Sequence, residues 1–282
     1  MIQKFYLLFL TFSMIILAIS YLRDINSLKI RTVTLLILLH LLCGVLISPD
    51  LIKNIFSLAL LSYSCWEFYK ATKQNIIFWF LSILSGILLY YSMRSLHAEI
   101  IYTTIVIFML YGLYLLFASN QTVNSLKHVN LIFFIPVGIS FFANLLTQNP
   151  HAIISLIIIL QFSDIFAYFG GKYFGSYKIF PATSPNKTAE GLLFSVLGVA
   201  LALLLNKLYI QSMTQSWWLI AIVILPLFSI ASNAGDLIFS KVKRSLKIKD
   251  YSDILPGHGG VLDRIDNVIY SSPLMYLLIH TI

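Results

Sequence analysis

The sequence predicts an all-α protein that crosses a membrane many times. Of its 282 residues, 59% are apolar and 11% are charged, and the mean hydropathy is +0.88. These values lie far outside the range of soluble domains. The apolar residues form long continuous runs, whereas a membrane barrel would show alternating segments of about 10 residues. Because hydrocarbon offers no partner to an unpaired backbone amide, each run is expected to be a helix.

Runs near the length that spans a bilayer give ten candidate helices. The second, sixth and tenth runs are short, so a count of eight or nine also fits the sequence. The first run has the form of a secretory signal, but the many later runs favour a retained helix. The ten runs lie near 5–22, 32–48, 52–69, 75–93, 99–118, 131–147, 152–169, 191–210, 217–239 and 267–281.

The basic residues give the orientation. In the ten-helix arrangement, fifteen of the nineteen Lys and Arg residues fall on one side, and cytoplasmic loops are the ones enriched in them. Both termini are then on the opposite face. Two cytoplasmic loops, 170–190 and 240–266, hold nine of the nineteen. The chain therefore divides into an amino-terminal helical half, 1–150, and a carboxy-terminal half, 151–282, that carries the chemistry.

The charge also limits the partners. The net charge is +8, but the basic residues sit in short loops and form no continuous basic face, so nucleic acid is not expected. Lipid headgroups and phosphorylated substrates are the expected partners, and the lipid bilayer is the expected environment. Cys43 and Cys65 lie inside apolar runs and are expected to be buried small hydrophobes. The compact chain favours a bacterial inner membrane, although an endoplasmic reticulum or mitochondrial location also fits.

Carboxylates flank the second loop. Asp236 lies at the end of the ninth run, with Ser240 at i+4 and Lys243 at i+7 on the same helix face. Asp263 and Asp266, three residues apart, share a face just before the last run. Mg²⁺ takes one or two carboxylates together with substrate phosphates and water, so these residues suit it. The plainer alternative is a loop whose charges only set topology and touch anionic lipid.

The same loop has glycines and a histidine that suit the binding of a phosphate group. Gly257, Gly259 and Gly260 allow unusual dihedral angles and a close approach of the backbone. Between them, His258 is a candidate for a phosphate contact, for a general base, or for a turn residue bonded to the backbone.

The first loop predicts a helix start. Ser184 followed by Pro185 suits an N-cap with proline at the first helical position. Lys187 and Thr188, in the expected first turn, would hold a nucleotide phosphate. A purely structural helix cap explains Ser184 and Pro185 equally well, but it does not explain why Lys187 and Glu190 stand beside them.

One acid stands apart from both loops. Glu67 lies inside the third run near its cytoplasmic end, where an ionisable group indicates a functional site. Snorkelling of its side chain to the interface explains it equally well.

The second loop resembles the signature of the phosphatidate cytidylyltransferase (CDP-diacylglycerol synthase) family. The fourteen matching positions are Ser240, Lys243, Arg244, Lys249, Asp250, Ser252, Leu255, Pro256, His258, Gly259, Gly260, Asp263, Arg264 and Asp266. The first loop resembles the preceding family motif through Asp164, Gly170, Gly171, Lys172, Gly175, Ser184, Pro185, Lys187, Thr188 and Glu190. Ala189 departs from it, since the family often has an aromatic residue there. The resemblance covers roughly residues 160–280.

The resemblance implies a reaction and a set of roles. CTP and phosphatidate would form CDP-diacylglycerol and pyrophosphate, with Mg²⁺ held by Asp236 and Asp263 and assisted by Asp266 through water. The expected catalytic residues are Asp236, Asp263, Lys243, Arg244, Lys249, Asp250, His258, Arg264 and Asp266. The expected substrate-binding residues are Ser184, Lys187, Thr188, Glu190, Ser240, Gly259, Gly260 and Asp164. A second cation such as K⁺ and a homodimer are left open.

Two other functions compete with this one. A related CTP-using lipid enzyme, such as a polyprenol kinase or a CDP-archaeol synthase, would differ mainly in its acceptor lipid. A transporter would fit the many helices and intramembrane polar groups such as Asn144, Gln161 and Asp164. Transporters, however, gather their polar features near the midplane, whereas here they gather in loops at one surface.

Overall fold

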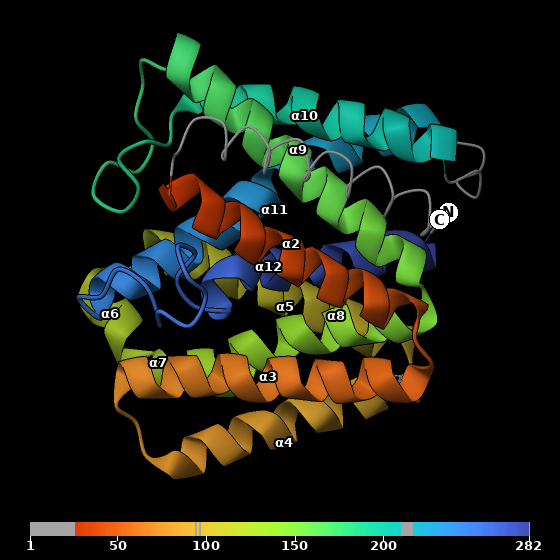
Figure 1. Ribbon diagram of the computed structural model, residues 1–282, viewed down its shortest axis with the longest axis vertical. Coiled ribbons are helices and arrows are strands. Elements are labelled where there is room, and N and C mark those ends of the chain that lie inside the picture. The colour runs from red at the N-terminus through yellow and green to blue at the C-terminus, as the bar shows by residue number, and fades with distance from the viewer. Residues whose placement is uncertain (1–25, 94, 96, 210–216, 282) are drawn as a thin grey trace.

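The computed structural model describes residues 26–281 except 94, 96 and 210–216. All regular elements in this part are helices, which confirms the predicted class (Figure 1). They are α2 (Asn26–Ile47), α3 (Asp50–Thr72), α4 (Ile76–Ser92), α5 (Ala98–Phe117), α6 (Asn120–Ser125), α7 (Lys127–Val129), the π-helical η1 (Asn130–Phe134), α8 (Ile135–Gln148), α9 (Pro150–Phe174), α10 (Ala189–Tyr209), α11 (Trp217–Ser245) and α12 (Leu262–Thr281).

The predicted runs from 32–48 onward each correspond to a helix of this series. The first run, 5–22, lies outside the described residues. The run 131–147 is longer than predicted, because α7, η1 and α8 continue one another from Lys127 to Gln148. The short α6 was not predicted, since its polar six-residue sequence has no apolar periodicity.

Three helical segments in the described part are long and apolar enough to cross a membrane: Ala98–Phe117, Lys127–Gln148 and Pro150–Phe174. Shorter apolar stretches lie at Thr32–Ile47, Ile76–Ser92 and Ala189–Leu205. Large apolar side chains on the outside of the bundle are widely exposed, such as Phe117 at 77% and Leu193 at 70%. Exposed apolar surface of this extent fits contact with lipid, although the ten-helix count itself stays a prediction.

The core of the bundle surrounds α8. In the segment Lys127–Gln148, 83% of the most apolar window is buried inside the protein, and α8 packs against α3, α4, α9 and α12. A helix that is apolar on all sides belongs in such a central position. Cys43 and Cys65 are buried free thiols, as predicted.

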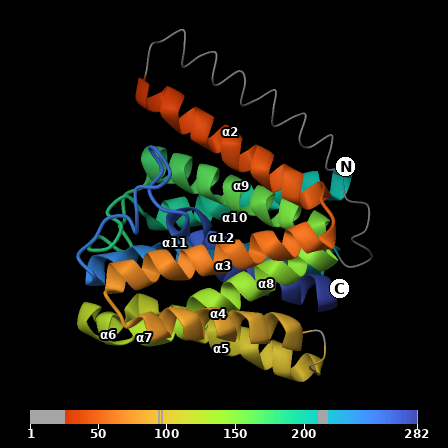
Figure 2. The same cartoon turned by 60° about the horizontal axis from the view of Figure 1, so that its bottom comes forward.

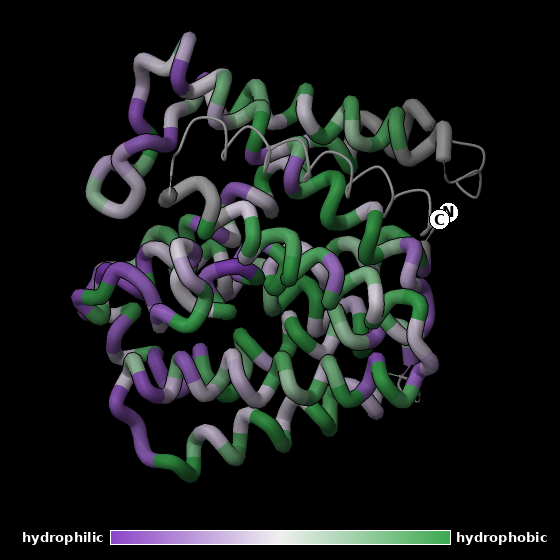
Figure 3. The backbone as a smooth tube through the Cα atoms, in the orientation of Figure 1, coloured by the Kyte–Doolittle hydropathy of each residue, from purple (hydrophilic) through white to green (hydrophobic). Residues whose placement is uncertain are grey.

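The two halves of the sequence interlock in space. Helices α11 and α12 pack against α5, and α12 also packs against α8 and α3. The long loops after α9 and after α11 lie at the same end of the bundle in both ribbon views (Figures 1 and 2). Hydrophilic residues are dense at that end, while the helices between the ends are mainly hydrophobic (Figure 3). The polar loops therefore form one surface, as the charge count predicted, and the division at residue 150 stays a prediction.

Close helix packing at Gly138 gives a test of the core. A methyl group there would lie 2.3 Å from Ile269 Cγ2 and 2.5 Å from the Ile269 carbonyl oxygen, so α8 and α12 must separate to accept it. Gly138→Ala should lower the free energy of unfolding by about 1–3 kcal/mol, measured by denaturant unfolding in detergent. Gly44→Ala is the control, because nothing lies within 4 Å of its added methyl. Equal stability of the two variants would contradict this packing.

Candidate active site

Asp263, in the first turn of α12, lies at the centre of a buried polar network. Its Oδ1 accepts a hydrogen bond from Lys243 Nζ at 2.6 Å, and the two side chains are only 2% and 11% exposed. Its Oδ2 accepts from the backbone N–H groups of Tyr251, at 2.9 Å, and Gly260, at 3.0 Å. One carboxylate thus joins the end of α11, the loop that follows and the start of α12.

Asp236 pairs with a different lysine. Its Oδ2 lies 3.0 Å from Lys187 Nζ, and its Oδ1 accepts from Ser240 Oγ at 3.4 Å. The Lys187 ammonium also donates to Asn233 Oδ1 at 3.1 Å. The Asp236 side chain is 42% exposed, whereas that of Asp263 is 2% exposed.

Asp164, on α9, joins the same region. Its two oxygens accept from Ser232 Oγ at 3.3 Å and from Asn267 Nδ2 at 3.2 Å. Electrostatic interactions link its carboxylate to Lys187 and to Asp236. Ser232 was not singled out from the sequence, where a neutral polar residue in an apolar run carries little signal.

Four carboxylates therefore form an acid cluster, defined here as Asp164, Asp236, Asp263 and Asp266. Asp266 is 7% exposed and repels both Asp236 and Asp263. Two lysines, Lys187 and Lys243, are paired with the cluster. The cluster thus holds more acids than lysines, an arrangement that suits a divalent cation.

The remaining lone pairs decide whether a cation fits. A carboxylate has about four acceptor sites. Three donors hydrogen-bond to Asp263 and two to Asp236, so each carboxylate still has an acceptor site for a cation. Within the described residues, no three His, Cys, Asp or Glu side chains converge as a preformed cage. This arrangement suits Mg²⁺, which draws most of its ligands from substrate phosphates and water.

Two cavities open beside the acid cluster. The first, of about 310 Å³, is here called the inter-helix cavity. Its lining residues are Asp164, Ala167, Tyr168, Ser184, Asn186, Lys187, Thr188, Gly191, Leu192, Asn233 and Asp236. The second, of about 330 Å³, is here called the loop cavity. Its lining residues are Lys249, Asp250, Asp253, Leu255, Gly257, His258, Gly259 and Arg264.

The turn at the loop cavity uses its glycines as the sequence predicted. Gly257 and Gly259 have φ of 74° and 79°, a region that side chains with a Cβ rarely enter. The His258 N–H donates to the Leu255 carbonyl at 2.8 Å, and the Leu255 N–H donates to the Gly259 carbonyl at 2.9 Å. The His258 ring borders the cavity, with Nδ1 3.5 Å from the Pro256 carbonyl oxygen.

The predicted helix start at Ser184 and Pro185 is wrong. Helix α10 begins at Ala189, and Thr188 is its N-cap, because Thr188 Oγ1 accepts from the Gly191 N–H at 3.1 Å. The chain before it is an irregular hairpin, in which the Ala189 N–H donates to Tyr177 at 2.9 Å and the Ile179 N–H donates to Lys187 at 3.2 Å. These long-range backbone bonds keep Ser184 in a turn, where it lines the inter-helix cavity.

Two predicted site residues support loops. Glu190 Oε1 accepts from Ser176 Oγ at 2.5 Å and from the Tyr177 N–H at 3.2 Å, both in the first loop. Arg244 donates to the Ile248 carbonyl at 3.1 Å, within the second loop. Both side chains therefore hold the chain around the cavities, and neither lines a cavity itself.

Tyr251 lies behind the network in the second loop. Burial and then the neighbouring Asp263 carboxylate raise the pKa of its hydroxyl well above the ordinary value, so the phenol stays neutral. Its ring packs against Phe68 of α3 at a centroid distance of 5.8 Å. The tyrosine thus anchors the loop to the amino-terminal helices.

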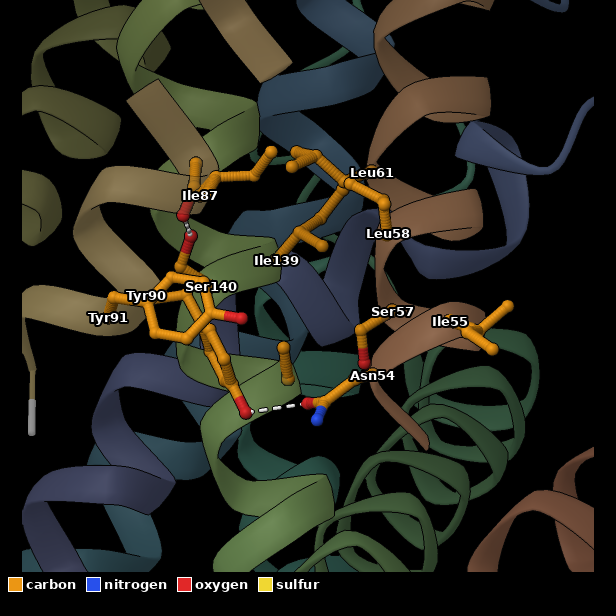
Figure 4. A pocket seen from close by; sticks show the side chains of 12 residues that line it. Asn54, Ile55, Ser57, Leu58, Leu61, Ile87, Tyr90, Tyr91, Ile139 and Ser140 are labelled. Carbon is orange, nitrogen blue, oxygen red and sulfur yellow. Dashed lines mark hydrogen bonds between the residues drawn. The ribbon is translucent and has the colours of Figure 1, made fainter. Parts of the chain in front are cut away.

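A third cavity lies away from the acid cluster, between α3, α4 and α8 (Figure 4). Its volume is about 210 Å³, and apolar side chains such as Leu58, Leu61 and Ile139 form most of its wall. The Tyr90 hydroxyl donates to Asn54 Oδ1 at 2.7 Å at one edge. With no charged group in its wall, this cavity does not fit a phosphorylated substrate.

Comparison with known proteins gives the family. The family model described as the cytidylyltransferase family matches residues 29–282. The chain belongs to this family. The acid cluster and both cavities lie within the matched residues of this family member, which supports an enzyme that transfers a nucleotidyl group.

Curated relatives of the chain carry the name phosphatidate cytidylyltransferase. The relative from Staphylococcus aureus strain COL is 38% identical over 149 residues, which are 52% of this chain and 55% of that protein. The Helicobacter pylori strain J99 protein is 38% identical over 150 residues, and a Staphylococcus epidermidis protein is 32% identical over 146 residues. Each match covers 52% of this chain and 55% of the relative. The chain thus spans about half the length of the curated relatives it matches.

The buried pair of Lys243 and Asp263 gives a stability test. Lys243→Met leaves Asp263 buried without its cation and should lower the free energy of unfolding by about 3–5 kcal/mol. Lys53→Met is the control, because its partner Asp50 is 72% exposed and the loss should stay below about 1 kcal/mol. Denaturant unfolding in detergent measures both. Similar losses would mean that Asp263 does not depend on Lys243.

Proposed function

We propose that this cytidylyltransferase makes CDP-diacylglycerol from CTP and phosphatidate. A phosphate oxygen of phosphatidate attacks the α-phosphorus of CTP, and a new P–O bond forms. The bond from the α-phosphorus to the oxygen that bridges to the β-phosphate breaks, and pyrophosphate leaves with that oxygen. Phosphatidate already presents an anionic oxygen, so positioning and charge neutralisation account for most of the catalysis.

The observation that carries the proposal is the acid cluster, two members of which line the inter-helix cavity, together with the cations in the walls of both cavities. Lys187 faces the inter-helix cavity, and Lys249 and Arg264 face the loop cavity. Cations in the walls of both cavities suit a reaction that joins two phosphorylated substrates, and a divalent cation would offset the carboxylates beside them. The family match over residues 29–282 and the names of the curated relatives support the same chemistry.

The resident metal is proposed from the charge of the acid cluster. Asp236 and Asp263 would hold Mg²⁺, with Asp266 beside them, and the ion would neutralise charge on the substrate phosphates. Lys243 is already paired with Asp263, so its role is to balance that carboxylate. Lys249 and Arg264, in the wall of the loop cavity, would bind phosphates, as would Lys187, which is paired with the more exposed Asp236. Ser184 and Thr188, in the wall with Lys187, would contribute hydroxyl contacts.

The location follows from the substrates. CTP is soluble, and the acyl chains of phosphatidate stay in the bilayer, so the reaction belongs at a membrane surface. We place both loops on the cytoplasmic face of an integral membrane protein, in keeping with the basic residues that they contain. Apolar residues such as Tyr168 and Leu192 in the wall of the inter-helix cavity favour that cavity for the lipid substrate.

The direct test is synthesis of CDP-diacylglycerol by purified protein given labelled CTP, phosphatidate and Mg²⁺. Asp236→Asn and Asp263→Asn should each lower kcat by at least about 10²-fold, because each removes charge from the proposed metal site. Asp50→Asn, an exposed acid of α3, is the matched control and should keep full activity. Phosphorylation of a polyprenol in place of this product would refute the proposal, as would full activity of Asp263→Asn.

Removal of the metal is a separate test. Chelation with EDTA should abolish the transfer, and added Mg²⁺ should restore it, because the acid cluster has more carboxylates than lysines and is the proposed metal site. K⁺ added alone should not restore activity. Product formation at an unchanged rate in excess EDTA would rule out a metal in this reaction.

A further inference from the structure

Glu67 is a buried acid on α3, far in sequence from both loops. It is 2% exposed, so the snorkelling alternative is wrong. Its Oε1 accepts from the Val261 N–H at 3.1 Å and from Ser252 Oγ at 2.5 Å, and its Oε2 accepts from the Leu262 N–H at 2.7 Å. A helix of the amino-terminal half thus binds the loop that precedes Asp263.

The bonded amides belong to the start of α12. The first N–H groups of a helix have no partner within the helix, and an anion there is also favoured by the helix dipole. Glu67 takes the amides of Val261 and Leu262, and Asp263 takes the preceding amide, of Gly260. Two carboxylates from different helices, Glu67 and Asp263, therefore accept hydrogen bonds from three consecutive backbone amides, those of residues 260–262.

The turn fits tightly between these carboxylates. A Cβ atom on Gly260 would lie 2.8 Å from Glu67 Oε1 and 3.1 Å from Asp263 Oδ2. Any movement of Glu67 therefore changes the space available to Gly260 and, through it, the orientation of Asp263. The contact joins α3 to the acid cluster through one residue.

We propose that Glu67 is a positioning residue, which fixes the amino terminus of α12 and thereby the side chains of Asp263, Arg264 and Asp266. This inference rests on the proposed function, because positioning matters only if these side chains act on substrates. Glu67 makes no contact with the cavities described above and acts through the backbone of the turn. Partners of this kind that orient site residues typically affect activity about 10–100-fold.

The main test is Glu67→Gln, which keeps the size of the side chain but loses its charge and one acceptor oxygen. We expect kcat to fall about 10–100-fold, KM for CTP and phosphatidate to change by less than about threefold, and the Mg²⁺ requirement to rise. Glu99→Gln, an exposed acid in the first turn of α5, is the matched control and should retain the wild-type kinetics. A folded Glu67→Gln protein with wild-type kcat and Mg²⁺ requirement would overturn the inference.

Gly260→Ala supplies an independent variant. Its added methyl presses on Glu67 and Asp263, so it should reduce kcat in the same way. In the double variant with Glu67→Gln, kcat should fall by less than the product of the two separate reductions, because both changes disturb the same contact. Fully additive losses would contradict the coupling.

Hydrogen exchange separates a failure of this inference from a failure of the proposed function. In Ser252→Ala, which removes one donor to Glu67 and keeps the helices intact, the amides of residues 260–262 should exchange about fivefold faster. This readout needs no substrate and remains available if Glu67→Gln does not fold. Unchanged exchange would refute the positioning role, whereas a wild-type protein with no transferase activity would refute only the function.

Discussion

The hydrogen bonds to Asp263 are the interaction on which the polar end of this molecule depends. A carboxylate that is 2% exposed is stable only if donors replace the water it has lost. Lys243 supplies the opposite charge, and the amides of Tyr251 and Gly260 supply fixed dipoles. Because these donors come from α11, the loop and α12, their arrangement fixes all three together.

The charge of the acid cluster gives this end of the bundle its chemistry. Four carboxylates lie near two lysines, and Asp164 and Asp236 line the inter-helix cavity, whereas Asp263 and Asp266 are buried. Such an excess of acidic groups is costly in a structural core but suits the binding of a cation together with anionic phosphates. The cations in the walls of the two cavities can then bind the phosphates of phosphorylated molecules.

The amino-terminal helices hold this end in place. Helix α8 fills the middle of the bundle and packs against α12, while Glu67 of α3 binds the first amides of α12. Thr34 of α2 donates to the Pro256 carbonyl at 3.1 Å. Helices α2, α3 and α8 therefore position the second loop and α12, which carry the family motif. These contacts explain how a polar loop is held in place beside an apolar bundle.

The sequence by itself determined the helical class, most helix positions and the gathering of both loops at one end, because apolar length and the distribution of basic residues are local properties. The face shared by Asp236 and Ser240 also followed from helical spacing alone. Only the tertiary structure decided that Lys187 pairs with Asp236, that Thr188 and not Ser184 caps α10, and that Glu67 binds α12. Each of these depends on chain segments distant in sequence, whose approach is set by the packing of the whole bundle.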